Sequence, residues 1–176
     1  MSGPDRVLVA YSSKYGATAE IAQAIGTALR VAGLEVDVER ARHVRSLDSY
    51  RAVVLGSAVY AGRWRGDAFR LLRRPSLKER EVWLFSSGPV GEDTGDPEQR
   101  DRFTRPPRVQ KAAARIGAHE HVVFGGMVAE DAGFIRKKMA RRIPPHLRDR
   151  RDWQQIESWA QSIAAALTDR PATGDH

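Results

Sequence analysis

Small hydroxyl residues and one glycine lie between an apolar run and a helix-patterned stretch near the start of the chain. The segment 7–18 reads VLVAYSSKYGAT, and its loop is Ser12, Ser13, Lys14, Tyr15, Gly16, Ala17 and Thr18. A strand that leads directly into a helix aims unpaired backbone N–H groups and the positive end of the helix dipole at one point. Phosphate binds well at such a point. The loop therefore predicts a phosphate site, with a serine-rich helix cap that holds no ligand as the alternative.

The residue types in this loop narrow the kind of phosphate. No glycine-lysine-serine sequence follows, so the loop is not a Walker loop. With only one glycine, it also lacks the dinucleotide fingerprint. Hydroxyls and amides without a metal ligand favour the monophosphate of a cofactor that stays bound.

Apolar strand-like runs alternate with helical patterns along the whole chain. The strand-like runs are 7–10, 34–38, 52–55, 82–85 and 122–124, and the helical patterns are 21–32, 68–73, 109–116 and 153–167. This alternation predicts an α/β fold, a doubly wound five-stranded parallel sheet with helices on both faces. The last helix has Trp153, Ile156, Trp159 and Ile163 on one face, and Asp152 is placed to cap it.

Ligands in such sheets bind beyond the carboxyl ends of the strands. The loops expected there are 12–18, 56–64, 86–91 and 125–128, and each contains glycine. Two longer polar excursions, 89–107 and 129–151, start from the same edge.

Three of these loops resemble the cofactor loops of flavodoxins in the right order. The stretch from Tyr11 to Glu20 resembles the flavodoxin loop around the phosphate of FMN, with Ala17 where an asparagine is frequent. GSAVYAGRW resembles the loop that covers one face of the flavin ring, and SSGPVG resembles the loop along its other side. The resemblance implies a flavodoxin-like fold, FMN as cofactor, and contacts from Ser57, Val59, Tyr60, Ala61, Gly62, Trp64, Ser87, Gly88, Pro89, Val90 and Gly91. Tyr60 and Trp64 would be the stacking aromatics, with packing of Trp64 under the following helix as the alternative for that side chain. A deazaflavin phosphate would fit the same loop.

Most of the length is similar, more narrowly, to the menaquinone-dependent protoporphyrinogen IX dehydrogenase branch of this family. The similarity includes the first loop, GSAVYAGRW and the ending DWQQIESWAQSIA. It implies an FMN-dependent oxidoreductase that oxidises protoporphyrinogen IX with a quinone as acceptor. The excursion 89–108 is rich in Asp and Glu and departs from the basic, aromatic insert of that branch, which leaves the substrate open. An electron-transfer protein and a sensory or scaffold domain without cofactor are the alternatives.

Basic residues accompany the expected flavin site. Arg63 and Arg65 lie beside the ring loop and Lys14 lies in the phosphate loop. Positive charge there favours an anionic reduced flavin by on the order of 1 kcal/mol for each partly exposed charge. The sequence thus predicts a raised two-electron potential, which suits oxidation of a small organic substrate. No protein acid–base pair stands out as catalytic.

Length and composition predict one domain at 1–169 with a disordered tail at 170–176. The 176 residues are 41% hydrophobic, with no cysteine and no apolar run long enough to span a bilayer. The absence of cysteine excludes disulfides and thiolate chemistry, and no secretory leader is seen, so we expect a cytoplasmic protein. His119 and His121 lack a third ligand, so no metal site is predicted.

The segment 134–151 carries the whole formal charge of +7, with eight Lys or Arg residues and one aspartate. Its first part, FIRKKMARRI, has the pattern of a short basic amphipathic helix. Peripheral contact with the inner face of a membrane, attraction of an anionic substrate, and plain packing on the domain are three interpretations. Nucleic-acid binding is disfavoured because no aromatic platform accompanies the charge.

Overall fold

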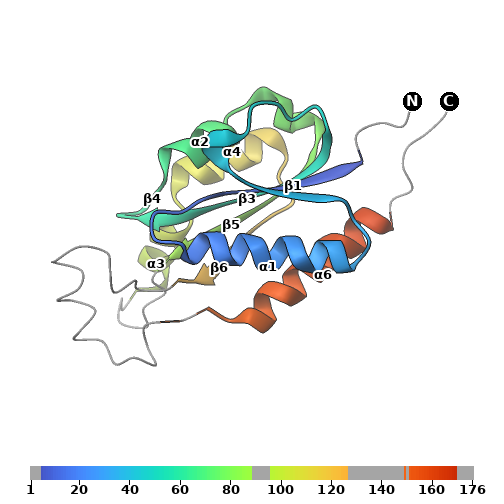
Figure 1. Ribbon diagram of the computed structural model, residues 1–176. Helices are drawn as coiled ribbons and strands as arrows, with labels where there is room; N and C mark the ends of the chain where they lie inside the picture. The colour runs from blue at the N-terminus through green and yellow to red at the C-terminus, as the bar shows by residue number, and fades with distance from the viewer. Residues whose placement is uncertain (1–4, 89–95, 127–148, 150, 170–176) are drawn as a thin grey trace.

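The computed structural model describes residues 5–88, 96–126, 149 and 151–169. Its centre is a parallel sheet in the order β2-β1-β3-β5-β6, as predicted for a doubly wound fold (Figure 1). The strands are β1 (Arg6–Ser12), β2 (Val36–Arg40), β3 (Tyr50–Tyr60), β5 (Glu81–Gly88) and β6 (Glu120–Gly125). A two-residue strand, β4 (Arg63–Trp64), pairs antiparallel with the end of β3.

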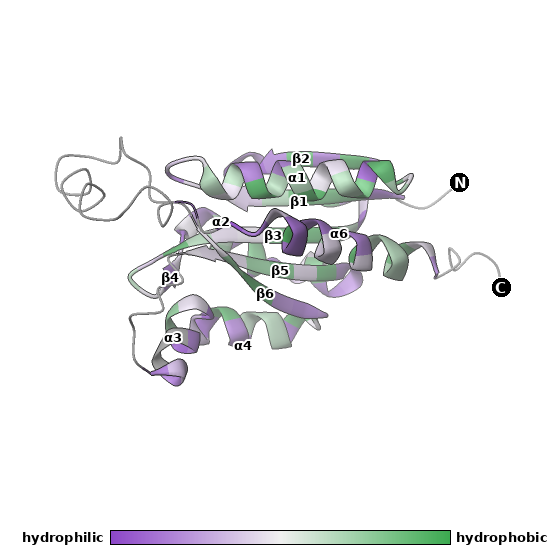
Figure 2. Cartoon of the chain, turned by 90° about the horizontal axis from the view of Figure 1, so that it is seen from below, coloured by the Kyte–Doolittle hydropathy of each residue, from purple (hydrophilic) through white to green (hydrophobic). Residues whose placement is uncertain are grey.

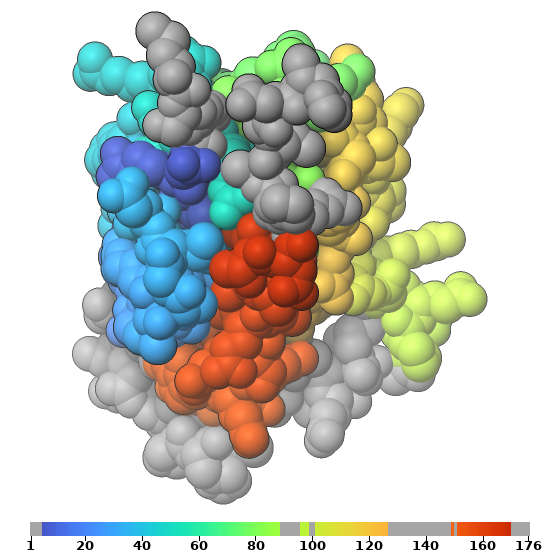
Figure 3. Space-filling view, turned by 90° about the vertical axis from the view of Figure 1, so that its right-hand side faces the viewer, coloured from blue at the N-terminus to red at the C-terminus, as the bar shows by residue number. Residues whose placement is uncertain are grey.

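Helices cover both faces of this sheet. On one face lie α1 (Ala17–Val31) and α6 (Trp153–Thr168), which pack side by side (Figure 3). On the other lie α2 (Gly66–Leu72) and α4 (Pro107–Ile116). The remaining elements are α3 (Pro97–Thr104) and the short 3-10 helices η1 (Ala41–His43) and η2 (Pro75–Glu79). Apolar and polar residues alternate along α1 (Figure 2), because one side of this helix is buried and the other meets water.

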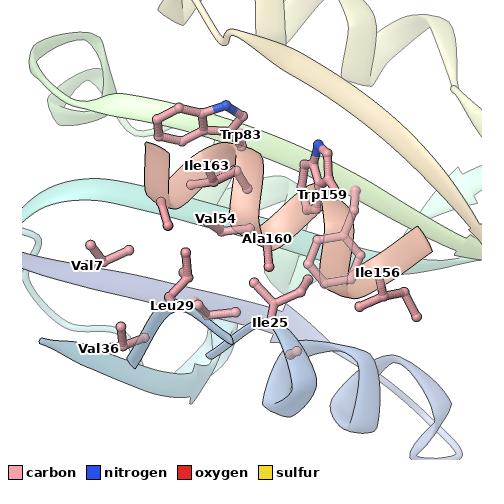
Figure 4. Close-up of a cluster of buried hydrophobic side chains, with 14 of the residues drawn as sticks. Val7, Ile25, Leu29, Val36, Val54, Trp83, Ile156, Trp159, Ala160 and Ile163 are labelled. Carbon is pink, nitrogen blue, oxygen red and sulfur yellow. The ribbon is translucent and has the colours of Figure 1, made fainter. Parts of the chain in front are cut away.

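Two apolar layers form the core, one on each face of the sheet. Figure 4 shows the layer that α1 and α6 cover, where Ile25 and Leu29 of α1 and Ile156 and Ile163 of α6 gather around Val54 of β3. In the same layer Phe85 lies against Phe124, with a ring-centroid distance of 5.9 Å. The Phe85 ring also fills the space over Gly56, where a Cβ atom would lie 2.0 Å from Phe85 Cζ. The helix cap expected at Asp152 is present, since its carboxylate accepts from the N–H of Gln155 at 3.0 Å.

Several boundaries differ from the sequence predictions. β2 begins at Val36 rather than residue 34, because the chain first turns through Gly33 at φ 92° and the N–H of Leu34 bonds to Leu29 O. β3 continues to Tyr60 and β5 to Gly88, so the first parts of the expected loops 56–64 and 86–91 are strand. The helix α3 was not predicted inside the polar excursion 89–107.

Trp153 is a further correction. It is the first residue of α6 and 43% exposed, so it is not part of the buried face predicted for this helix. Its ring packs instead under the guanidinium of Arg151, whose Cζ lies 4.7 Å from the ring centroid. The predicted basic helix at 134–143, the tail 170–176 and most of the segment 134–151 lie outside the described residues.

Candidate functional site

The loop between β1 and α1 is shaped by Gly16. This residue has φ 95°, a conformation that glycine adopts without strain and most other residues avoid. Its N–H donates to Ser13 Oγ at 2.9 Å, which closes the loop just before the helix begins at Ala17. A Cβ atom at Gly16 would meet nothing within 4 Å, so the space above the loop is open.

The donors around this opening fit a phosphate. No side chain caps α1, so the N–H groups of Ala17, Thr18 and Ala19 have no partner inside the helix, and the Glu20 N–H is the first to bond, to Gly16 O. Thr18 is 1% exposed, yet its hydroxyl has no hydrogen-bond partner among the described residues. A hydroxyl and backbone amides at a helix N-terminus, without partners among the described residues, form the donor set that suits a phosphate ester.

A polar network lies directly below the loop and was missed in the sequence. Ser12 donates through Oγ to Asp67 at 2.5 Å and accepts from Arg65 Nε at 3.1 Å. The backbone N–H of Arg65 donates to Ser57 Oγ at 3.0 Å. The sequence places Arg65 beside the ring loop, whereas the structure turns its guanidinium to Ser12, under the phosphate loop. The hydroxyls of Ser12 and Ser57 are used by this network and hold α2 in place against the loop.

The ring loop is a tight hairpin between β3 and β4. Ala61 at φ 48° and Gly62 at φ 66° form its turn, and the strained alanine is the kind of backbone position often found at functional sites. Tyr60 stands beside the phosphate loop, because its ring lies edge-on to that of Tyr15 with a centroid distance of 6.2 Å. Lys14 lies over the other aromatic, with Nζ 5.1 Å from the Tyr15 centroid.

Trp64 corrects one of the two stacking predictions. Its side chain is 6% exposed and its indole N–H donates to Ser86 Oγ at 2.8 Å. Val59, its partner in the β3–β4 pair, is also buried. Because β4 pairs with β3, the Trp64 side chain points into the core under α2 instead of over the opening. Tyr60 is the aromatic of this loop that remains partly exposed.

The third loop begins at the end of β5. Ser87 is 3% exposed and without a hydrogen-bond partner for its hydroxyl in the described part of the chain. Gly88 lies close to the end of β6, since the N–H of Gly126 donates to Gly88 O at 2.8 Å and a Cβ at Gly126 would lie 3.1 Å from that oxygen. Pro89, Val90 and Gly91, which the sequence assigns to the cofactor, lie outside the described residues.

Phe103 adds an aromatic side chain at this edge that the sequence did not suggest. It comes from α3, is 42% exposed, and covers Gly62, where a Cβ atom would lie 3.6 Å from the Phe103 ring. The sequence signal was weak because Phe103 is a lone apolar residue in a run of charged ones.

His121 closes a second chain of hydrogen bonds behind the ring loop, which is buried at Ser86 and exposed at Gln110. Its Nε2 lies 2.8 Å from Ser86 Oγ, the acceptor of the Trp64 indole, and its Nδ1 lies 2.7 Å from Gln110 Nε2. With the Gln110 amide as donor, Nδ1 accepts and Nε2–H donates to Ser86. Burial, and then the nearby Arg105 guanidinium, lower the pKa of His121 to about 4. The imidazole is therefore neutral at pH 7 and serves as a structural link.

This pKa predicts a pH-dependent stability. An unfolded chain protonates His121 near pH 6.5, whereas the folded chain resists protonation down to about pH 4. Stability is therefore complete above pH 6.5 and falls between pH 6.5 and 4, by at most about 3 kcal/mol. Urea unfolding at several pH values measures this loss. A His121→Gln variant is expected to flatten the curve in that window relative to the exposed control His43→Gln, and an unchanged curve would contradict the assignment.

No group of three or more candidate metal-binding side chains occurs in the part of the chain that the structure describes. His119 has other partners, since it contacts Glu81 and lies against the Trp83 ring at a centroid distance of 4.7 Å. Among the described helices, none is both long and apolar enough to cross a membrane.

Comparison with known proteins agrees with this geometry. The family model of the flavodoxin domain matches residues 8–152. A search of curated proteins finds no match. A flavodoxin from the domain Archaea superposes with a TM-score of 0.61 at 14% identity, covering 93% of this chain and 99% of that one. The flavodoxin of Streptococcus pneumoniae TIGR4 gives 0.63 at 19% identity, covering 91% and 98%.

A larger protein contains the same fold. The rubredoxin oxygen:oxidoreductase of Desulfovibrio gigas superposes with a TM-score of 0.61 at 16% identity, over 96% of this chain and 37% of that one. These superpositions show the shared fold. The family model extends over most of the chain. The sheet order, the loop before α1 and the family match lead to one conclusion. The chain belongs to the flavodoxin domain family, whose cofactor is FMN.

Proposed function

We propose that this chain binds FMN at the carboxyl edge of its sheet and works as a flavin-dependent oxidoreductase. The phosphate would lie on the loop from Ser13 to Thr18, and the ring would lie between the hairpin at Tyr60–Gly62 and the end of β5. The observation that carries the proposal is the unpaired donor set at Thr18 and the first turn of α1, above an open space at Gly16. Bound FMN would supply the electron chemistry.

The chain's own residues would bind and orient the cofactor. Arg65 lies under the phosphate loop, and Arg40 Nη1 lies 3.5 Å from Ser13 O. Together with the exposed Lys14, they surround the loop with positive charge, which favours a phosphate dianion. Asp67 holds Ser12 and so fixes the end of β1.

The proposed reaction is the oxidation of a small organic substrate, protoporphyrinogen IX by resemblance, with a quinone as acceptor. Cations near the flavin support a raised two-electron potential, and Phe103 offers an exposed aromatic surface next to the hairpin. A role as electron carrier is the second candidate, supported by the near-complete superposition on flavodoxins. Peripheral membrane contact through 134–151 remains a proposal.

Turnover separates the two roles. The FMN-loaded protein is mixed with protoporphyrinogen IX and a soluble quinone, without any partner protein, and the porphyrin product is followed by its fluorescence. Repeated turnover supports the oxidoreductase. Flavin that is reduced and reoxidised only through an added reductase supports the carrier, and a protein that takes up no FMN contradicts both.

Arg63 provides a test of the charge effect on the flavin. Its side chain is exposed on β4 and has no hydrogen bond or ion pair within the described residues. Loss of about 1 kcal/mol of electrostatic stabilisation lowers the two-electron midpoint potential by about 20 mV. We therefore expect Arg63→Gln to lower the potential by about 20 mV in a dye-equilibrated redox titration. Lys78→Gln, an equal charge change on η2 before β5, is expected to leave it unchanged, and equal shifts in both variants would rule out a local effect.

A further inference from the structure

A concave region lined by arginines lies between α2 and α4, on the sheet face away from α1. Its volume is about 330 Å³, within the range of small-ligand sites. The lining residues are Gly66, Phe69, Arg70, Arg73 and Arg115. Arg70 lies one turn along α2 from Gly66, Arg73 is the C-cap residue of α2, and Arg115 lies in the last turn of α4. We call this region the α2–α4 groove.

The three guanidinium groups of the groove are not neutralised. None of the guanidinium groups of Arg70, Arg73 and Arg115 has a hydrogen bond or ion pair to any residue that the structure describes, although the Arg73 backbone N–H donates to Phe69 O. Other arginines of the domain are used by the fold. Arg74 donates to Val44 O at 2.7 Å, and Arg80 donates to Tyr50 O at 2.9 Å. No carboxylate lines the groove.

The rest of α4 strengthens this positive field. Arg108, Lys111 and Arg115 are spaced three and four residues apart, so they share one side of the helix, and α4 contains no acidic residue. Asp67 is the one acidic residue of α2, and its carboxylate accepts a hydrogen bond from Ser12 Oγ. The positive charge of the groove is therefore available to bind an anionic ligand.

An aromatic ring lies among these cations. Phe69 is half-buried, and the Arg73 guanidinium lies over its ring with Cζ 6.0 Å from the centroid. Guanidinium groups bind phosphoryl oxygens through paired N–H donors, and both guanidinium and phenyl faces stack on planar rings. A phosphate joined to a flat heterocycle satisfies both features at once.

We propose that the α2–α4 groove binds a nucleoside phosphate. The phosphoryl group lies among Arg70, Arg73 and Arg115, and the base lies against Phe69. This site is separate from the FMN loop, because its arginines lie along the body of α2 and at the end of α4. Inorganic phosphate alone would bind the three guanidinium groups but would make no stacking contact with the Phe69 ring.

The test uses the FMN-loaded protein, so that the phosphate loop at Gly16 is filled, with ADP as the probe. Binding is measured by isothermal titration calorimetry and by backbone NMR shifts, with pyrophosphate and adenosine as comparison ligands. We expect saturable ADP binding with shifts confined to α2 and α4. Arg70→Gln and Arg115→Gln are each expected to weaken ADP at least about 10-fold, with FMN affinity unchanged. Arg45→Gln, the same charge change at an exposed position elsewhere, is the matched control.

Each outcome decides the proposal. Absence of saturable ADP binding, or equal weakening in the Arg45→Gln control, overturns it. If pyrophosphate binds as tightly as ADP, the base contributes no affinity. That result contradicts the contact with Phe69 and the proposal that the ligand is a nucleoside phosphate. Should the protein take up no FMN, the same titrations on the Gly16→Val variant still report on the groove, so failure of the two sites can be told apart.

Discussion

Replacement of Gly16 by valine is expected to weaken FMN binding at least about 100-fold. A β-branched residue cannot hold φ 95° without a cost of about 1–3 kcal/mol, so the loop changes shape. The bond from the Gly16 N–H to Ser13 Oγ is lost, and the amides of the first turn of α1 no longer point at one place. Hydrogen bonds to a charged group contribute about 1.5–3 kcal/mol each, so loss of one or two accounts for the factor. Fluorescence titration of the apoprotein with FMN measures it.

Gly33→Val is the matched control at the other end of the same helix. Gly33 has φ 92°, and a Cβ atom there also meets nothing within 4 Å. The two variants are therefore expected to lose similar free energy of unfolding, while only Gly16→Val loses FMN affinity. Equal affinities in the two variants would show that the loop before α1 does not hold the cofactor.

Replacement of Gly56 by alanine is expected to lower the free energy of unfolding by about 3 kcal/mol, the upper range for overpacking. The added Cβ would lie 2.0 Å from Phe85 Cζ, and the ring has little room to move. It is packed against Phe124 and Trp159, with a centroid distance of 6.1 Å to the indole. Urea denaturation measures the loss. FMN uptake is expected to fall with it, because Gly56 directly precedes Ser57 in β3.

Two further variants test the cause of this loss. Gly66→Ala is the control, because a Cβ there meets nothing within 4 Å and alanine favours the helix that begins at this residue. The double variant Gly56→Ala with Phe85→Leu is expected to lose less free energy of unfolding than the two single variants lose together, because the smaller side chain at position 85 relieves the contact. Strict additivity would contradict the proposed clash.

The order of strands and helices could be predicted from the sequence because the spacing and the length of each apolar run are typical either of a helix or of a buried strand. Ile21, Ile25 and Leu29 repeat at helical spacing and are all buried on α1. The buried runs at Val53 and Leu84 are continuous, as parallel strands covered on both faces require. Since parallel strands share one carboxyl edge, the loops that carry the site could be placed as well.

Side-chain directions within those loops could not be predicted. Trp64 looked available for stacking, and only its pairing with Val59 in the antiparallel β4 turns it into the core. Phe103 gave no signal, because its position beside Gly62 depends on how α3 folds back over the hairpin. The hydrogen bond from Ser12 to Asp67 joins residues 55 positions apart, and no local sequence pattern predicts such a contact.

The affinity of the apoprotein for FMN compared with riboflavin tests the central claim most directly. The two ligands share the ring and the ribityl chain and differ only in the phosphate, which the loop from Ser13 to Thr18 is proposed to bind. Titrated side by side at one pH and salt concentration, FMN is expected to bind at least about 100-fold more tightly. Equal affinity for the two ligands, or no binding of either, would contradict the account.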